Sequence, residues 1–296
     1  MIESSVIGSY PVSINNKIIM NDYFDQKQIS WNSYIKSAVD DMVSSGIDFI
    51  SDGQTRDPFI QLFTRKLKGC RIRIRTEIIG KVSYVSPITV EDQKYVRAII
   101  PKNKKLLGIL TGPYTLANSC VDLFYNNLEN LSIDFSEALH HEALELQKHV
   151  DLISIDEPFF SNSMPDYGKQ LISKIVQDIK IPTRLHVCGN VAGIISELIK
   201  MPVDILSCEF KASPHLIEEF NKYNFNQNLC FGSVRSDDTK VESVDEIVNH
   251  INKGLDYFGD KIVQIAPDCG QRLLPRDVAY QKLINLVKAG KIINGR

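Results

Sequence analysis

Four residues that lie far apart in the sequence carry side chains suited to a metal centre. His186 and Cys188 lie at the end of the apolar run TRLHV, Glu209 follows DILSC, and Cys269 lies just beyond KIVQIAP. Two thiols, an imidazole and a carboxylate form a donor set for tetrahedral zinc. Residues two positions apart on a strand point the same way, so one strand end can supply both His186 and Cys188. These four residues are the predicted metal ligands.

A centre of this composition favours thiol chemistry. Two thiolates, one carboxylate and Zn²⁺ sum to a single negative charge, and zinc strongly lowers the pKa of a thiol that enters the site. The deprotonated sulfur then remains a good nucleophile, whereas neutral or singly anionic ligand sets favour activation of water. A closed site with four protein ligands is usually structural, so a zinc barrel that acts as a binding module is the alternative from another class.

The elements that must position these ligands are eight short strands alternating with helices. Apolar or β-branched runs lie at 4–9, 47–51, 106–110, 152–155, 183–187, 204–207, 229–234 and 261–265, and helical periodicity lies at 31–46, 133–150, 190–200, 244–258 and 276–290. This alternation predicts an α/β protein with one (β/α)8 TIM barrel over residues 1–296. An open two-lobed sheet is disfavoured because a linker and a GxGxxG fingerprint are missing.

Local signals support several of these boundaries. The stretch 70–90 alternates apolar and polar residues around a glycine, which predicts a β-hairpin inserted after the second barrel strand. Gly46 is placed to end the first helix. Ser243 and Glu246 form a capping box, and Asn190 is placed to cap the helix after Cys188.

The barrel prediction adds substrate-binding candidates, because active sites of such barrels lie at the carboxyl ends of the strands. Polar residues that close the other apolar runs are Ser9, Asp52, Gln54, Asp156 and Glu157. Acids at a strand end suit a substrate ammonium, and a structural hydrogen bond to a loop is the alternative for each. Gly8 would let a substrate approach the backbone closely, and a simple tight turn is its alternative.

Composition excludes other classes of protein. The chain has 296 residues, a net charge of -2 and a pI near 6.3, so no basic field points to nucleic acid. No apolar run approaches the ~20 residues that span a bilayer, and the N-terminus lacks the pattern of a signal peptide. We therefore expect no membrane partner and a cytoplasmic location. The six cysteines show no CxxC pair and favour free or metal-bound thiols over disulfides.

Motifs over most of the chain resemble a known family. They are IGSYP (7–11), SDGQTRDPF (51–59), LTGPYTLA (110–117), ISIDEP (153–158), HVC (186–188), Glu209, VESVDEI (241–247) and APDCG (266–270). In this order they resemble the C-terminal catalytic barrel of cobalamin-independent methionine synthase, standing alone as in the archaeal core enzymes. The resemblance implies zinc held by the four predicted ligands and homocysteine as the thiol substrate. It implies that Asp156 meets the substrate ammonium and that Ile7 and Ser9 hold its carboxylate, partly through backbone N–H groups.

The chain departs from the family pattern where the methyl donor is handled. Gln54 stands where the long enzymes carry a Glu, so one contact to the ammonium becomes neutral. Asp237, within GSVRSDDTKVESV (232–244), stands near the position of a His that handles protons for the folate donor, and NSC (118–120) replaces a Trp expected to stack on folate. These departures favour a methylcorrinoid as donor, either methylcobalamin or a corrinoid protein, because cob(I)alamin leaves without protonation. Asp237 and Glu157 are the candidate catalytic residues.

Two alternatives within the thiol mechanism stay open. HVCGN (186–190) is also similar to the H-x-C-G-N segment of methylcorrinoid:coenzyme M methyltransferases, which share a barrel with uroporphyrinogen decarboxylases. The acids of ISIDEP favour an amino-acid thiol over a sulfonate thiol, because an ammonium needs a carboxylate partner. Folate-dependent methionine synthesis is the other alternative.

Overall fold

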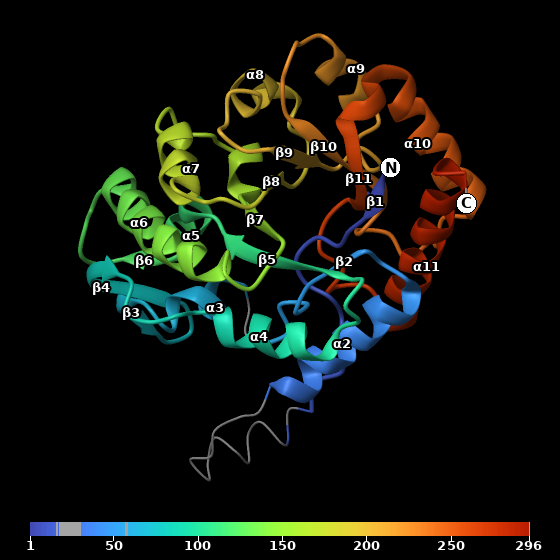
Figure 1. Ribbon diagram of the computed structural model, residues 1–296. Helices are drawn as coiled ribbons and strands as arrows, with labels where there is room; N and C mark the ends of the chain where they lie inside the picture. The colour runs from blue at the N-terminus through green and yellow to red at the C-terminus, as the bar shows by residue number, and fades with distance from the viewer. Residues whose placement is uncertain (16, 18–30, 57–58, 296) are drawn as a thin grey trace.

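Eight parallel strands close into a barrel in the computed structural model, which describes residues 1–15, 17, 31–56 and 59–295 (Figure 1). The strands are β1 (Glu3–Ser4), β2 (Phe49–Ile50), β5 (Lys105–Thr111), β7 (Leu152–Asp156), β8 (Thr183–Val187), β9 (Ile205–Cys208), β10 (Asn228–Val234) and β11 (Ile262–Pro267). Their order in the sheet is β1-β11-β10-β9-β8-β7-β5-β2, and a parallel bridge between Ser5 and Phe49 joins the two ends. The predicted (β/α)8 barrel is confirmed, and each predicted strand overlaps an observed one.

Helices surround the barrel and cover the outer face of its strands (Figure 1). They are α2 (Asn32–Ser45), α3 (Phe59–Thr64), α4 (Val90–Ile99), α5 (Pro113–Ser119), α6 (Leu128–Leu146), α7 (Gly168–Val176), α8 (Ile195–Leu198), α9 (Leu216–Asn221), α10 (Val244–Phe258) and α11 (Arg276–Ile293), with 3-10 turns η1 (Pro158–Ser161), η2 (Ala192–Ile194) and η3 (Gly259–Lys261). In α10, Ile247, Ile251, Gly254 and Phe258 are buried at spacings of three and four. This is the apolar stripe of a helix that packs one face on a core.

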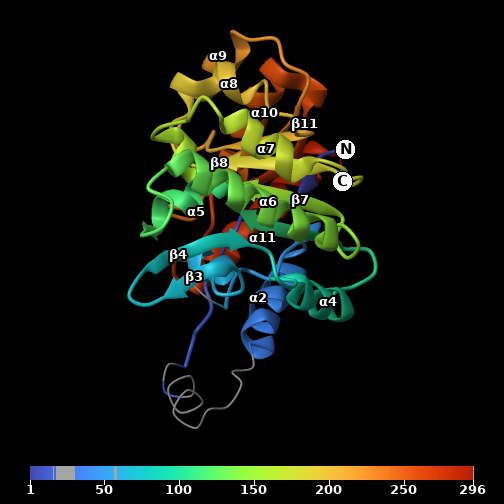
Figure 2. The same cartoon turned by 90° about the vertical axis from the view of Figure 1, so that its left-hand side faces the viewer.

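A small second sheet lies beside the barrel (Figure 2). β3 (Lys68–Ile72) and β4 (Thr76–Ser83) form an antiparallel hairpin after the second barrel strand, as predicted, and the short strand β6 (Val121–Asp122) adds to β4 in parallel. The predicted range 70–90 runs too far, because β4 ends at Ser83 and helix α4 begins at Val90.

Two of the three predicted caps are confirmed. Gly46 ends α2 with a φ of 93°, a left-handed conformation that glycine adopts without steric strain. Ser243 accepts from the backbone of Glu246, whose side chain accepts from the backbone of Ser243.

The third cap and its helix differ from the prediction. The Asn190 side chain accepts from the backbone N–H of Ala192, but the predicted helix over 190–200 is broken into η2 and the four-residue α8. Gly193 lies inside the segment and Pro202 follows it, and these residues disfavour a continuous helix.

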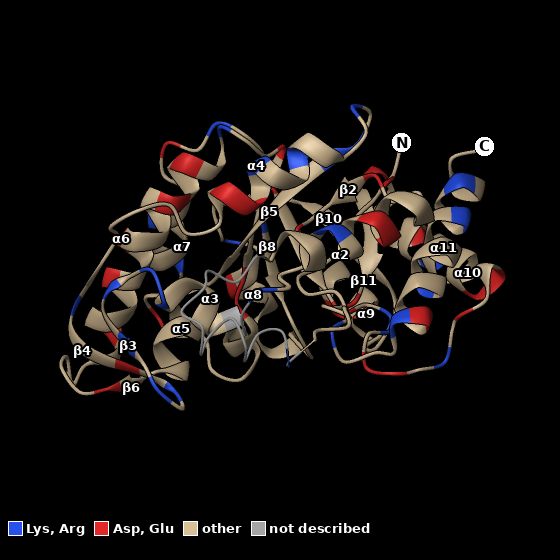
Figure 3. Cartoon of the chain, turned by 90° about the horizontal axis from the view of Figure 1, so that it is seen from below, with Lys and Arg blue, Asp and Glu red and all other residues tan. Residues whose placement is uncertain are grey.

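The first and last elements meet at the amino-terminal end of the barrel. The side-chain amide of Asn294 accepts from the backbone of Ile2 at 2.9 Å and donates back to it at 2.8 Å. Lys, Arg, Asp and Glu are interspersed over the helices in the view of Figure 3. Among the described residues no helix is both long and apolar enough to cross a bilayer.

Candidate active site and metal centre

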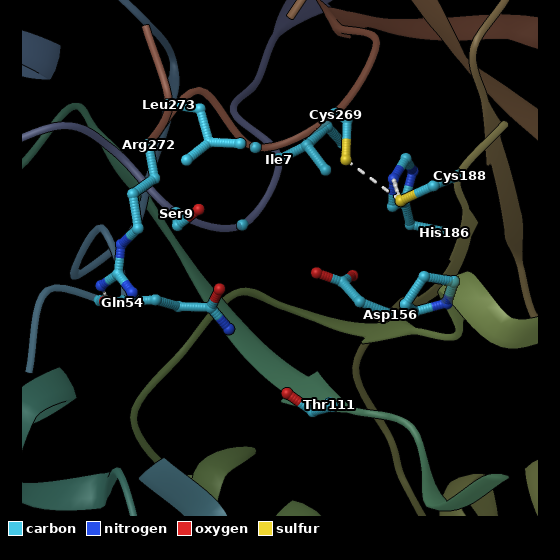
Figure 4. Close-up of a pocket in the computed structure, with 13 residues that line it drawn as sticks. Ile7, Ser9, Gln54, Thr111, Asp156, His186, Cys188, Cys269, Arg272 and Leu273 are labelled. Carbon is cyan, nitrogen blue, oxygen red and sulfur yellow. Dashed lines mark hydrogen bonds between the residues drawn. The ribbon is translucent and has the colours of Figure 1, made fainter. Parts of the chain in front are cut away.

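Three of the predicted ligands meet at one end of the barrel. The ligand atoms of His186, Cys188 and Cys269 all lie within 4.8 Å of one another. The imidazole Nε2 of His186 is 3.1 Å from the Cys188 sulfur, which is 3.0 Å from the Cys269 sulfur (Figure 4). Both thiols are free, since a disulfide would bring the sulfurs to about 2.05 Å. One imidazole and two adjacent thiols are a donor set that fits zinc.

Polar neighbours fix the orientation of these donors. Ser207 on β9 lies 3.1 Å from Nδ1 of His186, so Nε2 is left to face the sulfurs. The Ser236 hydroxyl accepts from the backbone N–H of Cys269 at 3.0 Å and donates to its carbonyl at 2.7 Å. Partners of this kind set the geometry of metal ligands in proteins.

Glu209 lies beside this cluster rather than within it. It is not among the three residues whose ligand atoms gather, and its carboxylate accepts a hydrogen bond from the backbone N–H of Gly189. Burial raises the pKa of Glu209, and the charge of Cys269 also raises it, so the two groups lie close enough to interact. The structure thus brings Glu209 to the neighbourhood of the predicted site.

The pKa values of the two thiols shift in opposite directions. A hydrogen bond from Cys188 holds the pKa of the Cys269 thiol well below its usual value, and His186 lowers this pKa further. The same hydrogen bond raises the pKa of Cys188. Burial lowers the pKa of His186, but Cys269 and Asp156 raise it more, so the net shift is upward. Negative charge is therefore favoured at Cys269 beside an imidazole.

A cavity of about 360 Å³ opens beside the sulfurs. Its walls come from the ends of β1, β2, β5, β7, β8 and β11 and the loops beyond them. The lining residues are Ile7, Gly8, Ser9, Gln54, Thr111, Asp156, Pro158, His186, Cys188, Cys269, Gly270, Arg272 and Leu273 (Figure 4). We call it the thiol cavity. All five residues predicted to contact the substrate line it. Its volume lies within the range of small-molecule sites.

Gly8 leaves room between two polar side chains of the thiol cavity. It has a φ of 50°, and a Cβ at this position would lie 3.3 Å from Oε1 of Gln54 and 3.5 Å from Oδ2 of Asp156. Gln54 is itself held by Asp52, whose Oδ1 accepts from its backbone N–H at 3.0 Å. A side chain at residue 8 would therefore fill the space in which these two oxygens could meet a substrate cation.

Asp156 and Glu157 are adjacent in sequence but occupy different environments. Asp156 lines the thiol cavity, where burial raises its pKa while His186 and Arg184 oppose that rise. Glu157 is fully buried and accepts from the backbone N–H groups of Tyr114 and Thr115, both at 2.9 Å, at the start of α5. Its carboxylate therefore serves as a helix-end anchor, which is the structural alternative named above.

The catalytic candidate Asp237 lies in a second cavity of about 440 Å³. The residues that line this donor cavity, as we call it, are Glu209, Ser236, Asp237, Thr239, Asp268, Cys269, Gly270, Leu273 and Leu274. Cys269, Gly270 and Leu273 line both cavities, so their loop forms the wall between them. Asp237 is 62 % exposed at its side chain and forms an ion pair with Arg235 at 2.8 Å, which lowers the pKa of Asp237.

Several site residues were not identified from the sequence. Arg272 and Thr111 line the thiol cavity, and Leu273, which is 95 % exposed, stands at its mouth. Thr111 is the residue directly after the predicted strand 106–110. A polar residue at the end of a barrel strand is a signal from which it could have been identified as a site residue. Arg272 lies in a loop after Cys269, and nothing in the local pattern distinguishes it from other surface arginines.

Comparisons with known proteins place this site in a family. A family model described as the catalytic domain of cobalamin-independent synthase matches residues 2–292. The chain belongs to this family. A methionine synthase of Methanocaldococcus jannaschii is 37% identical over 98% of the chain and 99% of its own length. A methionine synthase of Methanothermobacter marburgensis is 36% identical over 97% of the chain and 98% of its own length.

Solved structures share the fold of this family member. A B12-independent methionine synthase from Shewanella sp. W3-18-1, in complex with selenomethionine, superposes with a TM-score of 0.84 at 23% identity, covering 99% of this chain and 97% of that one. A methyltransferase from Methanosarcina mazei superposes with a TM-score of 0.68 at 19% identity, covering 99% of this chain and 94% of that one. The family description, cobalamin-independent, does not itself indicate a methylcorrinoid donor.

Proposed function

We propose that this chain is a methyltransferase that converts homocysteine to methionine in the cytoplasm, within one barrel over residues 1–296. The observation that carries the proposal is the gathering of two thiols and an imidazole in the wall of a cavity that also presents Asp156. The relatives named methionine synthase cover nearly the whole chain and support the same reaction. We propose zinc as the metal, with Glu209 joining His186, Cys188 and Cys269 as ligands.

Zinc, when bound, would lower the pKa of a substrate thiol and leave the sulfur nucleophilic. The residues of the chain orient that thiol. Asp156 and the side-chain oxygen of Gln54 face the space beside Gly8 and would receive the substrate ammonium. The segment from Ile7 to Ser9 lines the same cavity, where backbone N–H groups would hold the carboxylate. The amino-acid part of the substrate is thereby fixed while its sulfur reaches toward Cys269.

We propose a methylcorrinoid, free or bound to a corrinoid protein, as the methyl donor. This choice of donor is supported by the residues that line the two cavities. Among the described residues there, no Phe, Tyr or Trp offers a ring on which a folate could stack. Asn118, which lies within the stretch that replaces the expected Trp, instead donates to the carbonyl of Tyr114 at 2.8 Å. Asp237, near the position of the expected His, forms an ion pair with Arg235.

Purified, zinc-loaded protein tests the reaction directly. We expect methionine from homocysteine and methylcobalamin, and little or none from 5-methyltetrahydrofolate. The metal-free protein and Cys269→Ala serve as controls. If neither donor gives methionine above these controls, and an added corrinoid protein does not restore transfer, the proposed function is wrong. Methionine formed mainly from the folate would overturn the donor alone.

Cobalt substitution separates the remaining alternatives. Cobalt(II) spectra report a change of ligands when a thiol enters the site. We expect homocysteine to perturb the spectrum at lower concentration than coenzyme M, because Asp156 suits an ammonium and repels a sulfonate. The reverse order would favour the coenzyme M alternative. A spectrum that no thiol perturbs would favour a structural metal in a binding module.

A further inference from the structure

A fully buried arginine lies in the barrel interior below the thiol cavity. Arg184 is 0% exposed and sits on β8 two residues before His186, so both side chains point into the barrel. In the register of the sheet Ser154 lies opposite Arg184, and Asp156 lies opposite His186. A charged side chain in such a place is costly to bury unless its surroundings satisfy it.

The hydrogen bonds of this guanidinium go to neutral groups on several strands. Nε donates to the Ser154 hydroxyl at 3.1 Å, and Nη2 donates to the carbonyl of Val6 at 3.0 Å. Nη1 donates to the Ser5 hydroxyl at 3.0 Å and to Oε1 of Gln264 at 3.2 Å, and it contacts the Cys230 sulfur at 3.5 Å. Neutral oxygens thus accept these hydrogen bonds, and in the part of the chain that the structure describes no carboxylate forms an ion pair with Arg184.

Ser154 joins the buried charge to a carboxylate of the thiol cavity. Its hydroxyl accepts from Nε of Arg184 and donates to Oδ1 of Asp156 at 2.9 Å. The other oxygen of Asp156, Oδ2, faces Gly8 and the open space beside it. Oδ1 of Asp156 thus accepts a hydrogen bond from Ser154, while Oδ2 faces the cavity.

The same arginine also holds the opposite wall. Its contacts with Ser5 and with the carbonyl of Val6 fix the residues just before Ile7, where the chain leaves β1 and begins to line the cavity. The two parts of the cavity proposed to receive an ammonium and a carboxylate are therefore tied to one guanidinium. Such an arrangement fixes the spacing between them.

We propose that Arg184, acting through Ser154, is a positioning residue that gives the thiol cavity its preference for an amino-acid thiol. The inference rests on the proposed function, because it assigns the Asp156 carboxylate to a substrate ammonium. Arg184 touches no substrate. It holds Asp156 by way of the serine hydroxyl, and it holds the β1 end by direct hydrogen bonds.

Ser154→Ala is the sharpest test, because it removes the bridge and leaves the arginine in place. Binding of homocysteine and of 4-mercaptobutanoate, the same thiol without its amino group, is measured by calorimetry on zinc-loaded protein. We expect homocysteine to bind about tenfold more weakly to the variant, as for a lost hydrogen bond to a charged group. Binding of 4-mercaptobutanoate should be unchanged, and so should the zinc content.

Ser233→Ala is the matched control. Ser233 is also fully buried on a barrel strand, but its hydroxyl donates to the carbonyl of Phe231. We expect this variant to keep the wild-type preference between the two thiols. A Ser154→Ala variant that keeps the preference as well would overturn the inference, and so would equal weakening of both thiols.

Arg184→Lys and Arg184→Met extend the test. We expect the lysine variant to recover part of the homocysteine preference that the methionine variant loses. Equal preference in the lysine and methionine variants would contradict a role for the charge. If wild-type protein binds neither thiol, the proposed function fails and this inference fails with it. A wild type that binds homocysteine selectively while Ser154→Ala is unaffected defeats only the inference.

Discussion

The two cavities that meet at Cys269 are built differently. On the thiol side, Asp156 and His186 each have a buried hydroxyl partner, and Gln54 is fixed through its backbone by Asp52. On the donor side, Asp237 is exposed and forms its ion pair with Arg235, another exposed side chain. Ordered partners fix a small substrate closely, whereas an exposed pair contributes little energy and moves easily. Under the proposed function, this difference predicts that the barrel specifies its thiol strictly and that a larger, external molecule specifies the donor.

Removal of the residue shared by the two cavities should have the largest effect. We expect Cys269→Ala to lose its metal and all methyl transfer, because loss of a ligand should weaken metal binding by more than the roughly 10- to 100-fold typical when a hydrogen-bond partner of a ligand is lost. Metal content and methionine formation are the measurements. Circular dichroism should show an intact barrel, since the strand core does not depend on this thiol.

Cys208→Ala controls for the loss of a thiol as such. Cys208 is also near the carboxyl end of a barrel strand, but it is buried in the core and is not part of the ligand cluster. This variant should keep its metal and its activity. If Cys269→Ala retained metal while Cys208→Ala lost it, the assignment of ligands would have to be revised.

Two carboxylates that are adjacent in sequence, Asp156 and Glu157, should respond to substitution in different ways. Asp156→Asn should raise the KM for homocysteine by about 10- to 100-fold, because a charge-assisted contact is lost, with little change in the melting temperature. Glu157→Gln should lower the free energy of unfolding by about 1–3 kcal/mol, because the amide cannot accept from both N–H groups of Tyr114 and Thr115.

Steady-state kinetics and chemical denaturation of both variants provide the comparison. A Glu157→Gln variant that folds with wild-type stability but loses turnover would restore Glu157 as a catalytic candidate. An Asp156→Asn variant with an unchanged KM would remove Asp156 from the substrate site.

Much of this arrangement follows from the sequence because parallel strands impose strong local patterns. Buried apolar runs such as those of β5 and β8 were enough to predict the barrel. The predicted barrel in turn placed His186, Cys188 and Cys269 at the same end. The roles of Asp156 and Glu157 could not be separated in this way, because both close the same strand. What separates them is the approach of α5, a contact between residues more than 40 positions apart.

The arginine of the barrel interior shows the same limit. The pattern around Arg184 predicts a strand, but a charged residue in an apolar run gives no sign of which residues will satisfy it. Its partners come from β7, β10 and β11 and from the residues just after β1. Only the closed barrel brings these strands around one side chain.

A buried histidine on α10, His250, should give a smaller, pH-dependent effect. Burial, with the nearby charges of Lys211 and Lys253, lowers the pKa of His250 to about 4, although a hydrogen bond to the Gly232 carbonyl opposes this. The unfolded chain has a histidine pKa near 6.5, so it binds more protons than the folded chain between these values. Stability should therefore fall as the pH drops from about 6.5 to about 4, by up to about 3 kcal/mol from this residue.

His250→Gln isolates that contribution, because glutamine can donate to the same carbonyl and does not titrate. Free energies of unfolding at several pH values should decline less steeply for the variant than for the wild type. Parallel curves for the two proteins would contradict a buried neutral histidine. Carboxylates and metal ligands titrate equally in both, so the difference reports His250 alone.

The smallest effect is expected at the exposed acid of the donor cavity. Asp237→Asn should change methyl transfer from methylcobalamin by less than about twofold, because an exposed ion pair contributes only about 0–1 kcal/mol and this donor needs no proton. Asp238→Asn, a change in the neighbouring acid, controls for lost negative charge. A fall of about 100-fold in Asp237→Asn alone, the size of effect that general acid–base catalysis produces, would show that Asp237 handles protons. Such a result would also favour folate as the donor, because only a folate leaving group requires protonation, and the donor side would then be as strictly specified as the thiol side.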